Sequence, residues 1–139
     1  MTTQKKIALI VALIIIMGIW MVRIYGQTVD NVLQQVELAI QKGSAEDLAV
    51  HFNKVTELGV NGKNADYSGN QALFVMKEFF MSHPAQSFSI IHKGSTGTTY
   101  YAVGSYKSTH GESFDVNVFL KKYPEGYHID QLMFEKNKE

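Results

Sequence analysis

Residues 79–111, FFMSHPAQSFSIIHKGSTGTTYYAVGSYKSTHG, contain the pattern that decides the fold of this chain. Two phenylalanines end an apolar helical segment, and His83-Pro84 stops it, because the residue before a proline is pushed out of the helical region. Two runs of alternating character follow at about 86–94 and 98–107, separated by the small residues STG. Glycine in such a connection allows the positive φ of a tight hairpin. The stretch therefore predicts a helix that leads directly into an antiparallel hairpin.

Two further strands continue this pattern toward the carboxyl end, at about 112–121 and 126–135. The connections THG and PEG before them again contain glycine, which favours short hairpins. The first of the two strands alternates cleanly between apolar and polar residues, with apolar Phe114, Val116, Val118 and Leu120. The chain is therefore expected to end in four antiparallel strands.

The last strand breaks the alternation. Ile129 and then Leu132 and Phe134 share one face only if the strand accommodates one extra residue. A β-bulge supplies such a residue and restores the phase of the side chains. We therefore predict a bulge near Asp130-Gln131.

Residues 28–42, TVDNVLQQVELAIQK, have the spacing of an amphipathic helix. Apolar side chains recur at i, i+3, i+4 and i+7, which places them on one helical face. Thr28 is suited to cap the start of this helix and Gly43 to end it. The apolar face consists of Val29, Val32, Leu33, Val36, Ala39 and Ile40.

The segment SAED at 44–47 has the capping-box pattern, which predicts a second, short helix. Its inward residues would be Leu48 and Phe52, and the two helices would meet in a tight corner. Residues 54–60 alternate and are expected to form a strand. The following NGKNADYSG, at 61–69, has the composition of a turn.

The predicted elements follow the order helix, helix, strand, helix and four antiparallel strands. The third helix, at about 69–82, begins with another capping-box pattern at Ser68 and Gln71. Helices in this order must cover one face of the sheet. The sequence thus predicts a single α+β domain over residues 27–139, in which a strongly bent, mainly antiparallel sheet wraps over the helices as a cone.

The first 26 residues, MTTQKKIALIVALIIIMGIWMVRIYG, differ from the rest. Lys5 and Lys6 precede an uncharged apolar run at 7–22. This fits a secretory signal peptide cleaved after Gly26. It also fits an uncleaved membrane anchor with the two lysines held inside. Both interpretations export the domain, which is expected in the periplasm or outside the cell, either free or anchored to the inner membrane.

Charge and composition exclude some classes of function. The formal net charge of the 139 residues is zero, but residues 1–26 hold three of the 13 basic side chains and none of the 13 acidic ones. The remainder therefore has 10 basic and 13 acidic side chains, a net charge of −3, which argues against a nucleic-acid partner. The chain has no cysteine, so disulfides and thiolate chemistry are excluded.

Several segments of the chain resemble a known family: SAEDLAVHFN, VMKEFFMSHPAQSFSIIHKGS, YYAVGSYKSTHG and VFLKK…YHIDQLMFE. Through them the chain resembles DUF4783, small exported proteins of Bacteroidota with no established activity, within the nuclear-transport-factor-2-like (NTF2-like, or cystatin-like) fold. The resemblance implies this fold and export for residues 27–139. The first 26 residues differ from the family pattern, in which the signal segment ends in small residues before a Gln. The wider fold hosts ketosteroid isomerase and dehydratases as well as binding and dimerisation modules, so it does not select a function.

Aromatic residues and one histidine are the candidate ligand-binding residues. His92 follows Phe88 and Ile90 on one predicted strand face, which would direct it into the mouth of the cone. Tyrosines are favoured at binding surfaces because they combine an apolar ring with a polar tip, but they pack equally well across paired strands. The candidates, with packing as the alternative for each, are His92, Tyr101, Tyr67 and Tyr127.

The sequence offers little support for catalysis, a metal or a cofactor. His83 ends a helix, where a cation is favoured by the helix dipole, and His128 and Asp130 alone are too few ligands for zinc. An isomerase of this fold needs a carboxylate in an apolar pocket, whereas Asp66 lies in a turn and Asp115 on the polar side of a strand. We therefore name no catalytic or metal-binding residue and expect no cofactor.

The favoured hypothesis is a non-catalytic module of the cell envelope that binds a small molecule or a protein, with homodimerisation as a further expectation. The alternative is a small-molecule enzyme of the isomerase or dehydratase kind that uses the pocket of the cone. A structural role for a membrane-tethered domain is a third hypothesis. The membrane is expected to be a partner only through residues 7–22.

Overall fold

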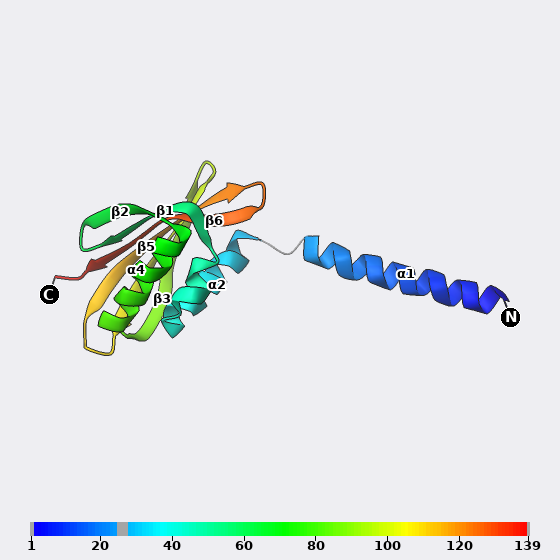
Figure 1. Ribbon diagram of the computed structural model, residues 1–139, viewed down its shortest axis with the longest axis horizontal. Helices are drawn as coiled ribbons and strands as arrows, with labels where there is room; N and C mark the ends of the chain where they lie inside the picture. Colours follow the sequence, from blue (N-terminus) through cyan, green and yellow to red (C-terminus); the bar gives the residue numbers. More distant parts are fainter. Residues whose placement is uncertain (1, 25–27, 139) are drawn as a thin grey trace.

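The computed structural model describes residues 2–24 and 28–138, with the side chains of residues 18–24 left out. The first helix, α1 (Thr2–Ile24), extends away from the sheet and the other helices (Figure 1). Its described large apolar side chains are exposed, from 49% at Val11 to 65% at Met17. Within the described residues, no helix is both long and apolar enough to cross a membrane. The predicted cleavage point after Gly26 lies outside these residues.

The rest of the chain is built on one six-stranded sheet with the strand order β2-β1-β6-β5-β4-β3. All neighbouring strands are antiparallel except β1 and β6, which run parallel, so the sheet is mixed. A parallel pair needs a long crossover, and here the crossover contains α4 and the four other strands. The strands are β1 (Phe52–Val60), β2 (Lys63–Ser68), β3 (Ala85–Thr96), β4 (Thr99–Ser108), β5 (Ser113–Tyr123) and β6 (Gly126–Lys136).

Three helices, α2 (Val29–Lys42), α3 (Ala45–Ala49) and α4 (Gly69–Ser82), lie on one face of the curved sheet (Figure 1). The predicted apolar face of α2 is buried except at Val29, which is half-buried against the core. Thr28 and Gly43 cap the two ends of α2, as predicted. The predicted α+β architecture, with helices packed on a bent sheet, is therefore confirmed.

A cluster of aromatic rings fills the space between α4 and the sheet. The ring of Phe79 lies 4.2 Å from that of Phe134, 5.4 Å from that of Phe114 and 5.6 Å from that of Tyr106. These three partners come from β6, β5 and β4, and each is fully buried. Burial, and secondarily the charge of Glu112, raises the pKa of Tyr106. The hydroxyl of Tyr106 therefore stays protonated and donates to the carbonyl of His83.

Two local predictions were wrong. Residues 61–69 were expected to form only a turn, but the turn is confined to Asn61-Gly62, with φ of 53° and 81°, and Lys63–Ser68 form β2. The prediction missed β2 because the strand is polar and mostly exposed, so it has no apolar alternation. Phe52 was expected on the short helix but opens β1, although it is buried as predicted.

The predicted bulge in the last strand is confirmed. Phe119 pairs with Gln131 and Leu120 with Ile129, so Asp130 is the extra residue on β6. Ile129, Leu132 and Phe134 are all buried as a result. Two irregularities that were not predicted lie in β3, at Gln86 and at Ile91.

Replacing Phe79 by alanine should lower the free energy of unfolding by about 3–5 kcal/mol, because it leaves a cavity among three strands. Phe74→Ala, on the same helix, is the matched control, since Phe74 is 64% exposed. Urea unfolding of the full chain monitored by circular dichroism would measure both. Equal losses for the two variants would contradict the central role of Phe79.

Candidate functional site

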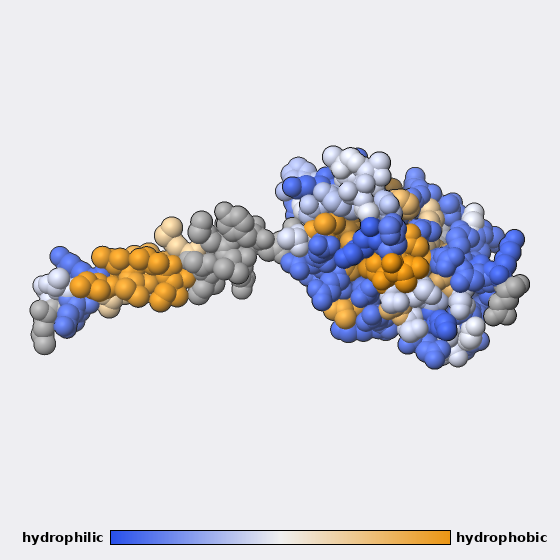
Figure 2. All heavy atoms as spheres, turned by 180° about the vertical axis from the view of Figure 1, so that it is seen from behind, coloured by the Kyte–Doolittle hydropathy of each residue, from blue (hydrophilic) through white to orange (hydrophobic). Residues whose placement is uncertain are grey.

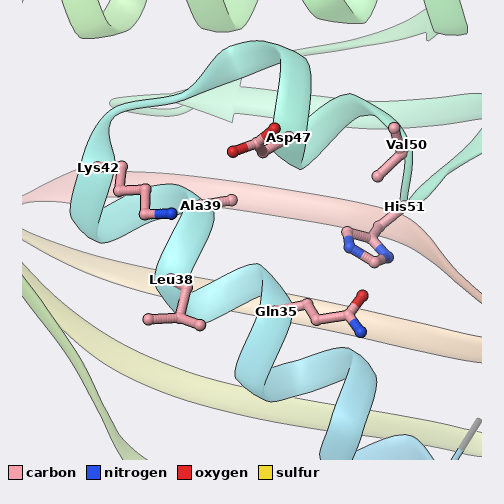
Figure 3. Close-up of a pocket in the computed structure, with 7 residues that line it drawn as sticks. All are labelled: Gln35, Leu38, Ala39, Lys42, Asp47, Val50 and His51. Carbon is pink, nitrogen blue, oxygen red and sulfur yellow. The ribbon is translucent and has the colours of Figure 1, made fainter.

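A shallow groove of about 260 Å³ lies between α2 and α3 (Figure 3). Its floor is apolar, and polar side chains stand at both of its ends. Lys42 and Asp47 lie at one end, whereas Gln35 and His51 lie at the other. The complete lining consists of Gln35, Leu38, Ala39, Lys42, Asp47, Val50 and His51.

The tight corner between the two helices positions the charged end of the groove. Gly43 adopts the left-handed conformation, with φ of 62°, and its N–H and that of Ser44 bond to carbonyls in the last turn of α2. The hydroxyl of Ser44 then accepts a hydrogen bond from the N–H of Asp47 at 3.2 Å and caps α3. Lys42 and Asp47 are thereby held on opposite sides of one short turn.

The polar side chains of the groove have no partner among the residues that the structure describes. Those of Gln35, Lys42, Asp47 and His51 make no hydrogen bond or ion pair with any other described residue. Three of them are exposed, so water can satisfy them. The groove therefore presents an amide, an ammonium, a carboxylate and an imidazole that are all available to a ligand.

His51 differs from the other polar residues of the groove because it is only 9% exposed. Its backbone is fixed between α3 and β6, since its N–H bonds to Leu48 and its carbonyl accepts from the N–H of Ile129. Burial, and secondarily the nearby His128, lowers the pKa of its ring. At neutral pH the ring is therefore uncharged and has one donor and one acceptor nitrogen.

The sequence-predicted residues His92 and Tyr101 lie together, but on the face of the sheet opposite to the helices. Their rings are 5.8 Å apart. Ile90 pairs with Gly104 and His92 with Val103, so the bulge at Ile91 shifts the phase of β3. The expectation that His92 enters the mouth of the cone is therefore wrong.

The other two candidates lie elsewhere. The rings of Tyr127 and Tyr100 pack edge to face, with their centres 5.5 Å apart. Burial, and secondarily the neighbouring Tyr100, raises the pKa of Tyr127. Tyr67 lies on β2, half-buried against the core, in a depression beside Val75. The four predicted residues thus occupy three separate places and do not form one site.

Two further polar clusters join residues that the sequence singled out. Nδ1 of His83 lies 2.6 Å from Oε1 of Glu112. This hydrogen bond is the main cause that lowers the pKa of Glu112, and the hydrogen bond from Lys136 is a smaller one. Asp130 accepts hydrogen bonds from Tyr123 at 2.8 Å and Asn53 at 3.0 Å. The described residues contain no group of three potential metal ligands.

A family model for DUF4783, a domain of unknown function, matches residues 33–135. The chain belongs to the DUF4783 family. A DUF4783 protein from Bacteroides uniformis superimposes with a TM-score of 0.72 at 24% identity, over 76% of this chain and 97% of that one. One from Bacteroides ovatus gives 0.71 at 28% identity, over 76% and 94%. No curated protein matches the chain.

The wider fold is NTF2-like. An NTF2-like protein of unknown function from Shewanella baltica superimposes with a TM-score of 0.59 at 17% identity, over 78% of this chain and 90% of that one. This level of identity shows the fold alone. The DUF4783 chain therefore has the predicted fold and family, and its function has to be argued from its own residues.

Sequence reasoning missed the groove of this DUF4783 chain. From the sequence, Lys42 was placed at the end of a helix and Asp47 in a capping box, and neither was a candidate for binding. Their common feature is the corner KGSAED at 42–47, which predicts that Lys42 and Asp47 lie close together. The burial of His51 depends on β6, more than 70 positions away, and has no local signal.

The ion pair of Glu112 should make stability depend on pH. Because the pKa of Glu112 is lowered in the folded state, its contribution is fully present above the ordinary value of about 4.5 and is lost as the pH falls through the lowered value. Glu112→Gln should therefore destabilise the chain near pH 6 and have less effect at low pH. Urea unfolding at several pH values, with the exposed Glu78→Gln as control, would measure this. A difference that does not change with pH would contradict it.

Proposed function

We propose that this chain is a non-catalytic binding module of the cell envelope, and that the outer face of its sheet binds a second copy. The outer face is defined here as the side of β4, β5 and β6 that faces away from the helices. The observation that carries the proposal is an apolar band across this face, flanked by charges of opposite sign.

The apolar band crosses the middle of the outer face. Tyr101 on β4 pairs with Phe119 on β5, and Val103 lies two residues from Tyr101 on the same face. Tyr101, Val103 and Phe119 are only half-buried. Seen from the side opposite to the helices, an apolar area surrounded by hydrophilic residues covers the middle of the domain (Figure 2). An apolar patch with a polar border is typical of a protein-binding surface.

The charges at the two ends of the band make the face complementary to itself. Lys121 pairs with His128 at one end, and Asp115 pairs with Glu135 at the other. A two-fold axis between two such faces, perpendicular to the strands, reverses the strand direction in the second copy. It therefore places Lys121 of one copy opposite Asp115 and Glu135 of the other, as an isologous interface requires.

The interior supports a non-catalytic role. Where an enzyme of this shape would need a pocket, the described residues pack Phe79, Phe114, Tyr106 and Phe134 against one another. Of the carboxylates considered from the sequence, Asp66 and Asp115 are exposed. Neither lies in the apolar pocket that acid–base catalysis by a carboxylate requires in this fold.

We infer the location in the cell envelope from the first 26 residues. Lys5 and Lys6 precede the exposed apolar side chains of α1, the arrangement of a signal peptide or an anchor. We expect the domain outside the cytoplasm.

Protease added to spheroplasts of producing cells should degrade the domain, because it is expected to lie outside the inner membrane. Survival of the domain until the cells are lysed would contradict export.

Self-association can be tested with variants of the outer face. In sedimentation experiments on the full chain in non-ionic detergent, Phe119→Asp should weaken dimerisation at least about tenfold, because it places a charge in the apolar band. Lys121→Glu should also weaken it, and adding Glu135→Lys should restore it. Lys54→Glu, at an exposed position on β1, is the control.

Two results would contradict this proposal. One is a chain that stays monomeric at all accessible concentrations. The other is an association that is unchanged by Phe119→Asp, which would locate the contact elsewhere, for example in α1.

A further inference from the structure

We propose that the groove between α2 and α3 is a binding site for a free α-amino acid, whose ammonium and carboxylate are carried on one carbon. This inference concerns the helical side of the domain and does not depend on dimerisation through the outer face of the sheet. It rests on the charges at one end of the groove, on its apolar floor and on the buried histidine at its other end.

The charged end fits both charges of an amino acid. The side chains of Lys42 and Asp47 converge on the same end of the groove (Figure 3), yet they are not within 4 Å of each other or of another described charge. A simple anion would be repelled by Asp47, and a simple cation by Lys42. A ligand with both charges side by side would pair each of them, with charge-assisted hydrogen bonds on both sides.

The middle of the groove fits the side chain of such a ligand. Ala39 is buried in the floor, and Leu38 and Val50 flank it with 45% and 72% of their surface exposed. Pockets for drug-sized molecules have volumes of about 300–1,000 Å³. The volume of about 260 Å³ therefore suits a smaller solute, of the size of an amino acid.

The end of the groove away from Lys42 and Asp47 favours a ligand whose side chain ends in a polar group. His51 as a residue is only 9% exposed, and its ring lines the groove and makes no hydrogen bond to any described residue. Buried polar groups are normally paired, so this ring is a site that a ligand can satisfy. Because burial keeps the ring neutral, it can donate to or accept from the ligand, as can the amide of Gln35 beside it. An amino acid with a short apolar stem and a polar tip, such as L-glutamine, matches the groove best.

Calorimetric titration of the full chain with L-glutamine tests the proposal. Saturable binding is expected, and N-acetyl-L-glutamine and L-glutaminamide should bind at least about tenfold more weakly, because each lacks one of the two charges. L-Leucine and L-methionine, which keep both charges but lack the amide tip, should bind more weakly than L-glutamine and more tightly than the blocked compounds.

Variants locate the site. Lys42→Met and Asp47→Asn should each weaken binding of L-glutamine at least about tenfold, since each leaves one ligand charge unpaired. Lys54→Met and Asp66→Asn make the same changes at exposed positions of β1 and β2 and should leave the affinity unchanged. Phe119→Asp should also bind normally, which separates this site from the outer face.

Either of two outcomes would overturn the proposal. The first is that none of L-glutamine, L-leucine and L-methionine binds saturably to the full chain. The second is that binding occurs but is equally strong in the groove variants and in their controls.

Discussion

The packing of Phe79 against three neighbouring strands is the contact on which the rest of the structure depends. Its ring meets Tyr106, Phe114 and Phe134, which come from β4, β5 and β6. One side chain on α4 can reach all three strands only if the sheet curves around it. Because protein interiors are close-packed, the ring both enforces the curvature and occupies the space that the curvature encloses. The binding sites proposed above therefore lie on the surfaces of the domain.

The position of α2 follows from a second constraint at the edge of the sheet. The amide of Gln41 donates to the carbonyl of Phe88 at 2.9 Å, and Glu37 accepts from the N–H of Ile90 at 2.8 Å. These bonds satisfy backbone groups on the open side of β3, so they protect an edge that could otherwise pair with another chain. They also anchor α2 on the sheet. With α2 fixed, the short turn at Gly43 determines where α3 lies, and thereby the width of the groove.

Structural features that interrupt the alternation of apolar and polar residues could be predicted from the sequence. Features that leave this alternation unchanged were missed. The bulge at Asp130 was found because Ile129 and Leu132 are three positions apart, which breaks a period of two. The bulge at Ile91 was missed because Ile90 and Ile91 are both apolar, so the pattern continues while the phase of the strand changes. His92 was placed on the wrong face as a direct consequence. The groove had no periodic signal, since exposed polar residues form its ends and the burial of His51 requires β6.

The two proposed binding surfaces lie on opposite sides of the aromatic core. The groove is part of the helical layer, and the outer face belongs to the far side of the sheet. A dimer formed through the outer faces would therefore leave both grooves open and pointing away from each other. No described residue belongs to both surfaces, so occupation of one should change affinity at the other only through a conformational change of the core. The close packing around Phe79 opposes such a change, and the two binding events are expected to be independent. This arrangement suits a module that recognises two partners at once, whereas an enzyme must bring its reactive groups together at one place.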